Sequence, residues 1–241
     1  MTKCAVINLS GNTGKTTLTK HLLTPQLGAR RIQIEDTNTG DGEPDFELAA
    51  KKFQTLAAEL NVSADEENFV IDIGASNAKA MIDHFSKLKS TRSSIDYWVV
   101  PVVSASKQKT DSINTVRALI EIEVEPKKII VVMNNVEDID SFEDDFRGIF
   151  ALRKLGVVVA DQAVLATDVF EMLKGDNRSV FDLANNPPDF KSLKQAARAS
   201  SNASELDKVG RNMVMQDLAE AAADNLRSVF DSMGIKSTTV A

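Results

Sequence analysis

Short apolar runs rich in β-branched residues alternate with segments of helical periodicity through most of this chain. The apolar runs cover residues 4–9, 31–35, 69–74, 97–103, 128–136 and 156–160. Apolar residues at helical spacing fall between them, at residues 15–26, 46–60, 77–90, 107–122 and 141–155. Near-continuous apolar runs are typical of strands buried on both faces, and strand–helix alternation favours a parallel sheet. We therefore expect a three-layer α/β fold, with a mostly parallel sheet and helices on both faces.

After Ala160 the strand-like runs stop and helical patterns take their place. Helices are predicted over residues 167–175, 179–184 and 204–233, and the last of these ends before Gly234. Asp189 follows two prolines and is a candidate start for a further helix. We expect one domain over residues 1–190 and a helical C-terminal extension, residues 191–241, packed on the same domain.

The composition of the chain excludes several classes of protein. The chain has 241 residues, of which 43% are hydrophobic, and an α/β domain of this size is ordinary. A net charge of −7 argues against coating nucleic acid with the whole surface. One cysteine cannot form an intramolecular disulfide, and two histidines supply no recognisable zinc spacing. Without a signal-peptide pattern or a long apolar run, we expect a cytoplasmic protein with no membrane span.

The first predicted strand leads into a glycine-containing loop, and a helical pattern follows at once. This order of strand, loop and helix is the context of a P-loop, and it predicts a P-loop NTPase fold. Glycines let backbone N–H groups turn toward phosphate oxygens, and the helix N-terminus adds partial positive charge. Lys15 would reach the β- and γ-phosphates, and the Thr16 hydroxyl would bind Mg²⁺. The nucleotide-binding residues would be Gly11, Asn12, Thr13, Gly14, Lys15, Thr16 and Thr17.

A simpler interpretation of the same stretch is a tight glycine turn beside an exposed lysine. The predicted strand, the loop, Lys15-Thr16 and the amphipathic helix follow one another in the order that a phosphate site requires, and this favours the phosphate site over a simple turn.

Asp72 follows three apolar residues and stands two residues before Gly74. This pattern fits a Walker B or switch II segment, in which the carboxylate binds Mg²⁺ through water and the glycine lets the loop follow the γ-phosphate. The alternative is a strand-end aspartate that caps a helix. With the loop at Lys15 nearby, we interpret Asp72 as a catalytic and metal-site residue together with Thr16.

The loop resembles the deviant P-loop of the ParA/MinD family, which reads Lys-Gly-Gly-x-Gly-Lys-Thr-Thr. Ser10 occupies the position of the family's signature lysine, and Asn12 occupies the position of one of its glycines. At the position of Leu9 the family pattern has no glycine, and neither does this chain. In ParA and MinD the signature lysine reaches across a nucleotide-sandwich dimer. The matching residues are Gly11, Gly14, Lys15, Thr16 and Thr17.

A narrower resemblance rests on two stretches. INLSGNTGKTTLTKHLLTPQL (7–27) and IEDTNTGDG (34–42) are similar to StbB-type plasmid stability proteins, which are ParA-like ATPases of conjugative plasmids. This resemblance implies a protein that binds ATP with Mg²⁺ and hydrolyses it slowly. Its function would be plasmid stability, partition or positioning, with a link to conjugative transfer.

The resemblance also implies further site residues. ParA-like proteins carry Asp-x-Asp after the second strand, and these positions are Glu35 and Thr37 here, so Glu35 or the intervening Asp36 would position the attacking water. Asn134, with Asn135 as second choice, would read the adenine edge. The guanine pattern Asn-Lys-x-Asp is not met, which favours ATP over GTP. Backbone groups near Ala160 and Asp161 would contribute to the base site.

Partners follow from the same resemblance. We expect a DNA-bound adaptor protein and a nucleotide-dependent homodimer. Basic residues of the C-terminal helices could also contact DNA nonspecifically. Acidic residues are interleaved with them, however, and this favours an ordinary mixed helical face. Two other functions remain open. One is a nucleotide switch or binding protein without useful turnover, and the other is a small-molecule kinase or ligase on a P-loop scaffold.

Overall fold

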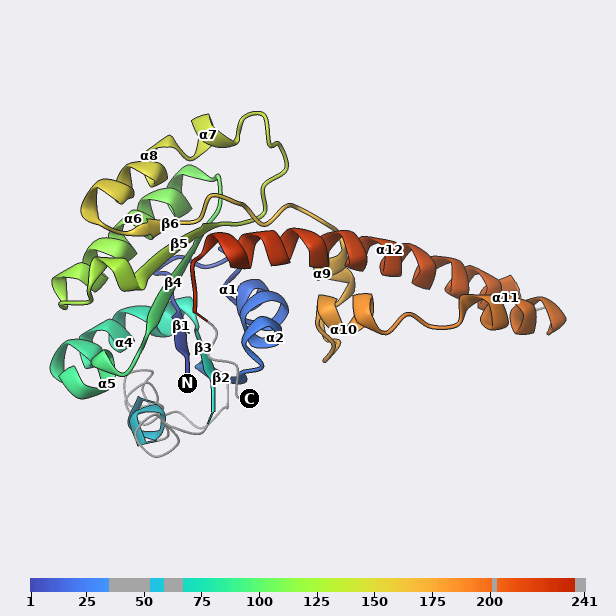
Figure 1. Cartoon of the computed structure of the whole chain (residues 1–241), viewed down its shortest axis with the longest axis horizontal. Coiled ribbons are helices and arrows are strands. Elements are labelled where there is room, and N and C mark those ends of the chain that lie inside the picture. The colour runs from blue at the N-terminus through green and yellow to red at the C-terminus, as the bar shows by residue number, and fades with distance from the viewer. Residues whose placement is uncertain (35–52, 59–66, 201–202, 237–241) are drawn as a thin grey trace.

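The computed structural model describes residues 1–34, 53–58, 67–200 and 203–236 of the chain. At its centre is a six-stranded sheet in the order β2-β3-β1-β4-β5-β6, in which every neighbouring pair is parallel (Figure 1). The strands are β1 (Lys3–Val6), β2 (Arg30–Ile34), β3 (Phe69–Ile73), β4 (Tyr97–Val102), β5 (Ile129–Met133) and β6 (Val158–Val159). The predicted parallel α/β fold is confirmed.

Helices cover both faces of this sheet (Figure 1). One group consists of α4 (Ala75–Lys87), α5 (Lys89–Ser93), α6 (Ser106–Glu121), α7 (Phe142–Asp145), α8 (Arg147–Phe150) and the 3₁₀ segments η2 (Pro126–Lys128) and η3 (Ala151–Leu155). Residues 53–58, also helical, add Phe53 and Leu56 to the core on that face. The other group consists of α1 (Lys15–Thr17), η1 (Leu18–Leu23), α2 (Thr24–Leu27), α9 (Val169–Met172), α10 (Val180–Asn185) and α12 (Ala203–Ser232).

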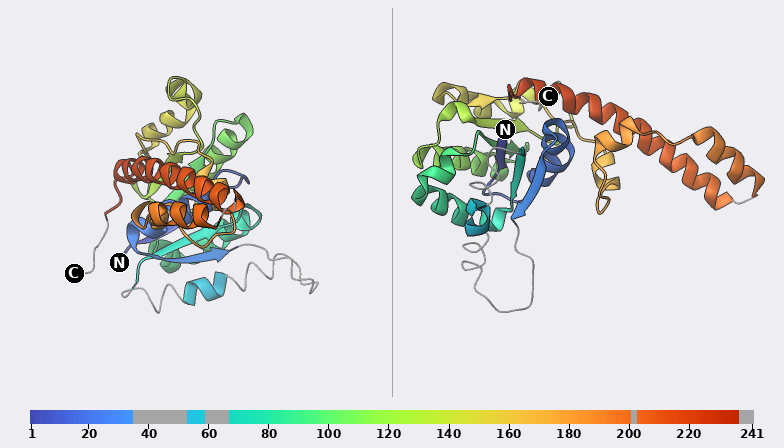
Figure 2. Two further views of the ribbon diagram at one scale, coloured as in Figure 1. Left: turned by 90° about the vertical axis from the view of Figure 1, so that its right-hand side faces the viewer. Right: turned by 60° about the horizontal axis from the view of Figure 1, so that its bottom comes forward.

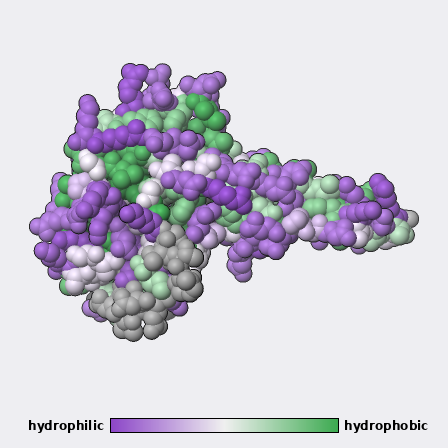
Figure 3. All heavy atoms as spheres, viewed as in Figure 1, coloured by the Kyte–Doolittle hydropathy of each residue, from purple (hydrophilic) through white to green (hydrophobic). Residues whose placement is uncertain are grey.

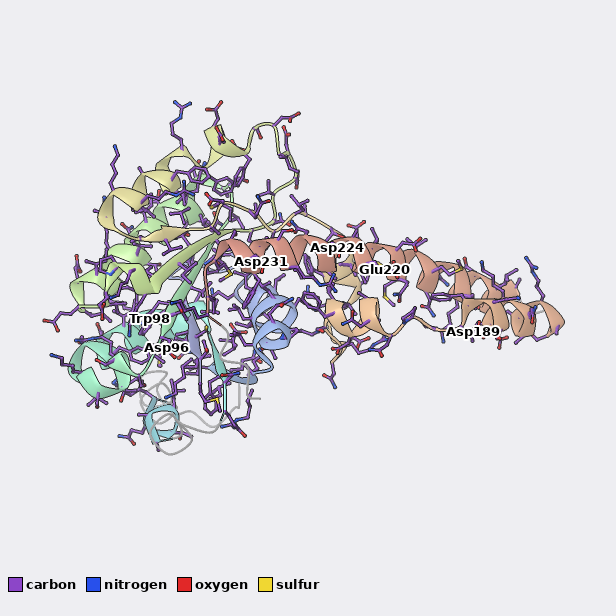
Figure 4. The ribbon with its side chains drawn as sticks, in the orientation of Figure 1. Asp96, Trp98, Asp189, Glu220, Asp224 and Asp231 are labelled. Carbon is purple, nitrogen blue, oxygen red and sulfur yellow. The ribbon has the colours of Figure 1, made fainter. Side chains whose placement is uncertain are left out.

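Successive strand residues are buried on opposite faces, because side chains alternate along a strand. On β4, Trp98 packs in the cluster with α4 and α6, whereas Val99 packs in the cluster with η1 and α12. The ring of Trp98, which is labelled in Figure 4, meets the ring of Phe85 of α4 edge to face, with 4.9 Å between the ring centroids. This double burial explains why the central strands read as continuous apolar runs.

The helix predicted over residues 15–26 is continuous but not regular. A π-helical stretch, η1, separates α1 from α2. Leu18 and Leu23 lie five residues apart and are both buried in the cluster with α12, which matches the wider i→i+5 turn of a π-helix. The segment predicted over 141–155 is instead broken into α7, α8 and η3. Asp144, Asp145 and Gly148 have low helix propensity, so the interruption has a local reason.

The C-terminal part of the chain is helical, as predicted. Asp189 accepts a hydrogen bond from the Ser192 N–H and caps α11 (Phe190–Ala199). The long helix α12 ends before Gly234, which has a φ of 65°. Its C-terminal half, including Leu226 and Val229, is buried in the core cluster on the η1 face.

The outer part of α12 and the whole of α11 extend away from the sheet as an arm (Figures 1 and 2). Polar residues dominate its visible surface, with apolar patches between them (Figure 3). Leu193, Leu206 and Val214 are exposed on the arm. Within the residues that the structure describes, no helix is both long enough and apolar enough to span a membrane.

His21 joins η1 to the start of α10. Its Nδ1 accepts a hydrogen bond from the Val180 N–H at 3.2 Å, and its ring lies 5.4 Å from that of Phe170. Burial, reinforced by Lys20 and Arg31, lowers the pKa of His21 from 6.5 to about 4. The unfolded chain therefore binds one more proton between these pH values. The stability contributed by neutral His21 is complete above pH 6.5 and is lost as the pH falls toward 4.

We predict that His21→Gln reduces the acid sensitivity of the fold, because the glutamine carbonyl can accept the same hydrogen bond without titrating. Between about pH 7 and pH 4.5, the wild type should lose about 2 kcal/mol more stability than the variant. Urea unfolding of both proteins without nucleotide measures this difference. Equal losses would show that the His21 proton does not contribute.

Candidate functional site

Asn8 anchors the loop that follows β1. This residue is buried, and its Nδ2 donates to the Pro101 carbonyl and to Ser112 Oγ, both at 2.7 Å. Its Oδ1 accepts from the Ser10 N–H at 2.8 Å. The side chain therefore ties the loop to β4 and α6. We did not single out Asn8 in the sequence, although an uncharged polar residue inside the apolar run 4–9 is a usable signal.

Two residues of the loop have left-handed backbone conformations. Asn12 has a φ of 56° and Gly14 a φ of 86°. Asparagine is one of the few residues besides glycine that tolerates this region, which explains how Asn12 can occupy a position where the similar pattern has glycine. Gly14 also lacks space, since a Cβ atom there would lie 1.9 Å from Asn134 Nδ2.

Lys15 opens the helical segment at the end of this loop. Its side chain is buried, and Nζ donates to the Ser10 carbonyl at 2.8 Å. The ammonium group thus lies against the backbone at the start of the loop. Ser10, at the position of the signature lysine, is 7% exposed.

Asp72 is the centre of a buried polar cluster between β2, β3 and the helical segment. Its Oδ2 accepts from Thr16 Oγ1 at 3.1 Å and from Thr19 Oγ1 at 3.0 Å. A third donor is Arg31 Nη2, at 2.7 Å. Asp72 Oδ1 has no hydrogen-bond partner within the described part of the chain.

These residues fit a Mg²⁺ site in part. The Thr16 hydroxyl lies on the cleft described below and next to Asp72, as a P-loop threonine should. The Asp72 carboxylate, however, is already paired with a guanidinium. Neither Thr19 nor Arg31 was a candidate in the sequence. A charged residue at the start of the predicted strand 31–35 was the available signal for Arg31.

A cleft of about 780 Å³ opens at the carboxyl ends of the strands. The loop residues 11–17 form one wall. Lys20 and His21 of η1 also line it, and the rest of the lining comes from residues after β3, β4 and β5 and from the segment around α9, including Gly74, Ser104, Asn135, Leu165, Thr167 and Phe170. A position at the carboxyl ends of parallel strands is the usual one for ligands of such sheets.

The cleft is positively charged although the protein is acidic. Lys15, Lys20 and Lys174 line it, and Glu171 is the one acidic residue among its described lining residues. Lys20 Nζ donates to the Leu173 and Asp176 carbonyls, so it also fixes the segment after α9. An anionic ligand would meet a favourable local potential here.

The residues predicted for the base site have different positions. Asn134 is 5% exposed and lines the cleft, and its Nδ2 donates to the Thr13 carbonyl at 3.2 Å. Ala160 is fully buried and its N–H donates to Val131, while Asp161 pairs with Arg153. Neither Ala160 nor Asp161 is among the cleft-lining residues that the structure describes; Leu165 and Phe170 lie there instead.

The residues predicted to position the attacking water, Glu35 and Asp36, lie outside the described residues, as does Thr37.

Comparison of the sequence with family models and with curated proteins finds no match. Solved structures do match. The ATP complex of Cyanothece McdA is 13% identical, with a TM-score of 0.55 over 100% of this chain and 99% of that one. A chain of the MinC:MinD cell division complex of Aquifex aeolicus is 12% identical, with a TM-score of 0.51 over 100% and 98%. The pnob8 ParA structure is 13% identical, with a TM-score of 0.50 over 93% and 99%.

At such low identity these matches speak for the fold. The chain has the fold of the ParA/MinD-type deviant Walker ATPases.

Proposed function

We propose that this protein binds ATP in the cleft and hydrolyses it slowly. The observation that carries the proposal is the loop of residues 11–17, which places Lys15 and the start of a continuous helical segment at one wall of a positively charged cleft. Backbone N–H groups at such a helix start, together with a lysine, bind phosphate oxygens. The left-handed conformations of Asn12 and Gly14 give the loop its curvature.

Each of the candidate site residues would have its own role in binding and hydrolysing ATP. Lys15 would bind the β- and γ-phosphates, and Thr16 would hold Mg²⁺, with Asp72 behind it. Mg²⁺ supplies charge neutralisation for phosphoryl transfer. Asn134 would contact the base from its place beside Thr13. Asp36, or Glu35, remains the proposed group that positions water.

The biological role we propose is positioning or partition, of the StbB type, in the maintenance of a conjugative plasmid. The fold supports this role in general, since the structures with the same fold include a ParA and a chain of the MinC:MinD cell division complex. Our proposed cycle is an ATP-dependent change in binding to a DNA-bound adaptor protein, with a nucleotide-dependent homodimer as the ATP-bound form. Hydrolysis would reset the cycle.

Nonspecific DNA contact in this cycle would use the basic residues of both C-terminal helices, which are Lys191, Lys194 and Arg198 on α11 and Lys208, Arg211 and Arg227 on α12. On α12, Glu220, Asp224 and Asp231 add negative charge (Figure 4). Such acids repel the phosphate backbone and argue against a DNA-binding face along the whole arm.

A second candidate function is a nucleotide switch without useful turnover. Two observations favour it. Ser10 stands where the similar family has its signature lysine and is buried. In addition, Arg31 is already paired with the Asp72 carboxylate. The kinase or ligase alternative gains no comparable support.

We predict that Lys15→Ala abolishes most ATP binding, because it removes the cation against the loop. ATP at a hundred times its Kd should stabilise the wild type by about 2.7 kcal/mol. A thermal-shift titration measures the effect, with Lys127→Ala as the control, since Lys127 is an exposed lysine paired with Glu125. An undiminished shift in Lys15→Ala would place the ligand elsewhere.

We predict a preference for adenine. The chain has Asn135 and Glu137 where a guanine-reading site has lysine and aspartate. Displacement of a fluorescent ATP analogue should therefore require less ATP than GTP. Equal displacement would mean that Asn134 does not discriminate between the bases.

We predict slow release of phosphate from ATP that disappears in Lys15→Ala. Phosphate release at saturating Mg²⁺, with and without DNA, distinguishes the two candidate functions. Slow turnover, whether or not DNA raises it, supports the ATPase cycle. If ATP binds and no Lys15-dependent phosphate release appears under either condition, the nucleotide switch is the correct function.

A further inference from the structure

Arg31 reaches the candidate site from the edge of the sheet. In the parallel register, Gln33 of β2 lies opposite Asp72 of β3, and Arg31 lies opposite Val70. Side chains two residues apart on a strand share a face, so Arg31 lies on the same face as Asp72. Its guanidinium runs along that face to Asp72 Oδ2 at 2.7 Å and also contacts Gln33 Oε1 at 3.2 Å.

This ion pair is largely shielded from water. The Asp72 side chain is 1% exposed and that of Arg31 is 22% exposed. At short range and away from solvent, a cation cancels most of the field of a carboxylate. Thr16 and Thr19 donate to the same oxygen and stabilise the charge further. The charge of the Asp72 carboxylate is thus already neutralised by Arg31. A divalent cation beside Thr16 would gain little attraction from this carboxylate and would lie near the positive guanidinium.

We propose that Arg31 is a resident counter-cation of Asp72, and that it makes nucleotide binding in the cleft largely independent of Mg²⁺. This inference rests on the proposed ATP site. Arg31 takes over the neutralisation that the carboxylate would otherwise offer to the metal. The metal then contributes to affinity only through the nucleotide's own phosphates and the Thr16 hydroxyl.

The decisive quantity is the ratio of the Kd for ATP in EDTA to the Kd in saturating Mg²⁺. For the wild type we expect a ratio within about threefold of one. Arg31→Gln keeps a hydrogen-bond donor and removes the cation, so its ratio should rise to about tenfold or more. Calorimetry, or displacement of a fluorescent ATP analogue, measures both constants without turnover.

Arg30→Gln is the matched control, because Arg30 is the preceding residue of the same strand and pairs with Glu67 near the surface. Its ratio should equal that of the wild type. Arg31→Lys restores a cation, and its ratio should return toward the wild-type value. A merely structural role for Arg31 would lower the melting temperature of Arg31→Gln and leave the ratio unchanged.

Two results would overturn the inference while leaving the ATP site in place. One is a wild-type ratio above about threefold, and the other is the same ratio in Arg31→Gln as in the wild type. The wild-type ratio alone can still overturn the inference if Arg31→Gln does not fold. If the wild type binds no ATP in either buffer, the proposed function fails, and the inference fails with it.

Discussion

The buried carboxylate of Asp72 holds together the parts of the structure on which the candidate site depends. Thr16 belongs to α1, Thr19 to η1 and Arg31 to β2, and all three donate to one oxygen of a residue on β3. Removing a carboxylate from water is costly unless donors and an opposite charge replace the water. The position of the helical segment over the sheet is therefore linked to the position of the edge strand.

Two asparagines also support the loop. Asn8 ties its beginning to Pro101 and Ser112, and Asn134 ties the Thr13 carbonyl to the end of β5. The contact of Asn134 with Gly14 leaves no room for a side chain at that position. The loop is thus shaped by three neighbouring strands before any ligand binds, and a preformed loop reduces the ordering cost of binding.

Similarity to McdA, a chain of the MinC:MinD complex and ParA is similarity of fold, at 12–13% identity. The argument for function comes from the site itself. There the chain combines the loop after β1, which we propose as the phosphate site, with two departures from the similar family pattern, the buried Ser10 and the paired Arg31. Both departures concern charge at the reacting phosphates. They bear on the metal dependence and turnover that we propose, while the loop itself keeps Gly14, Lys15 and Thr16 at the wall of the cleft.

The sequence by itself determined the alternation of strands and helices, the loop from Gly11 to Thr17 and the long final helix. These are local signals, carried by periodicity and by residue types a few positions apart. Only the tertiary structure decided that Arg31 pairs with Asp72, 41 residues away, and that His21 accepts a hydrogen bond from Val180, 159 residues away. It also placed Leu165 and Phe170, rather than Ala160 and Asp161, on the cleft. Such pairings depend on strand order and on helix placement over the sheet, and local periodicity carries no information about which distant side chains will meet.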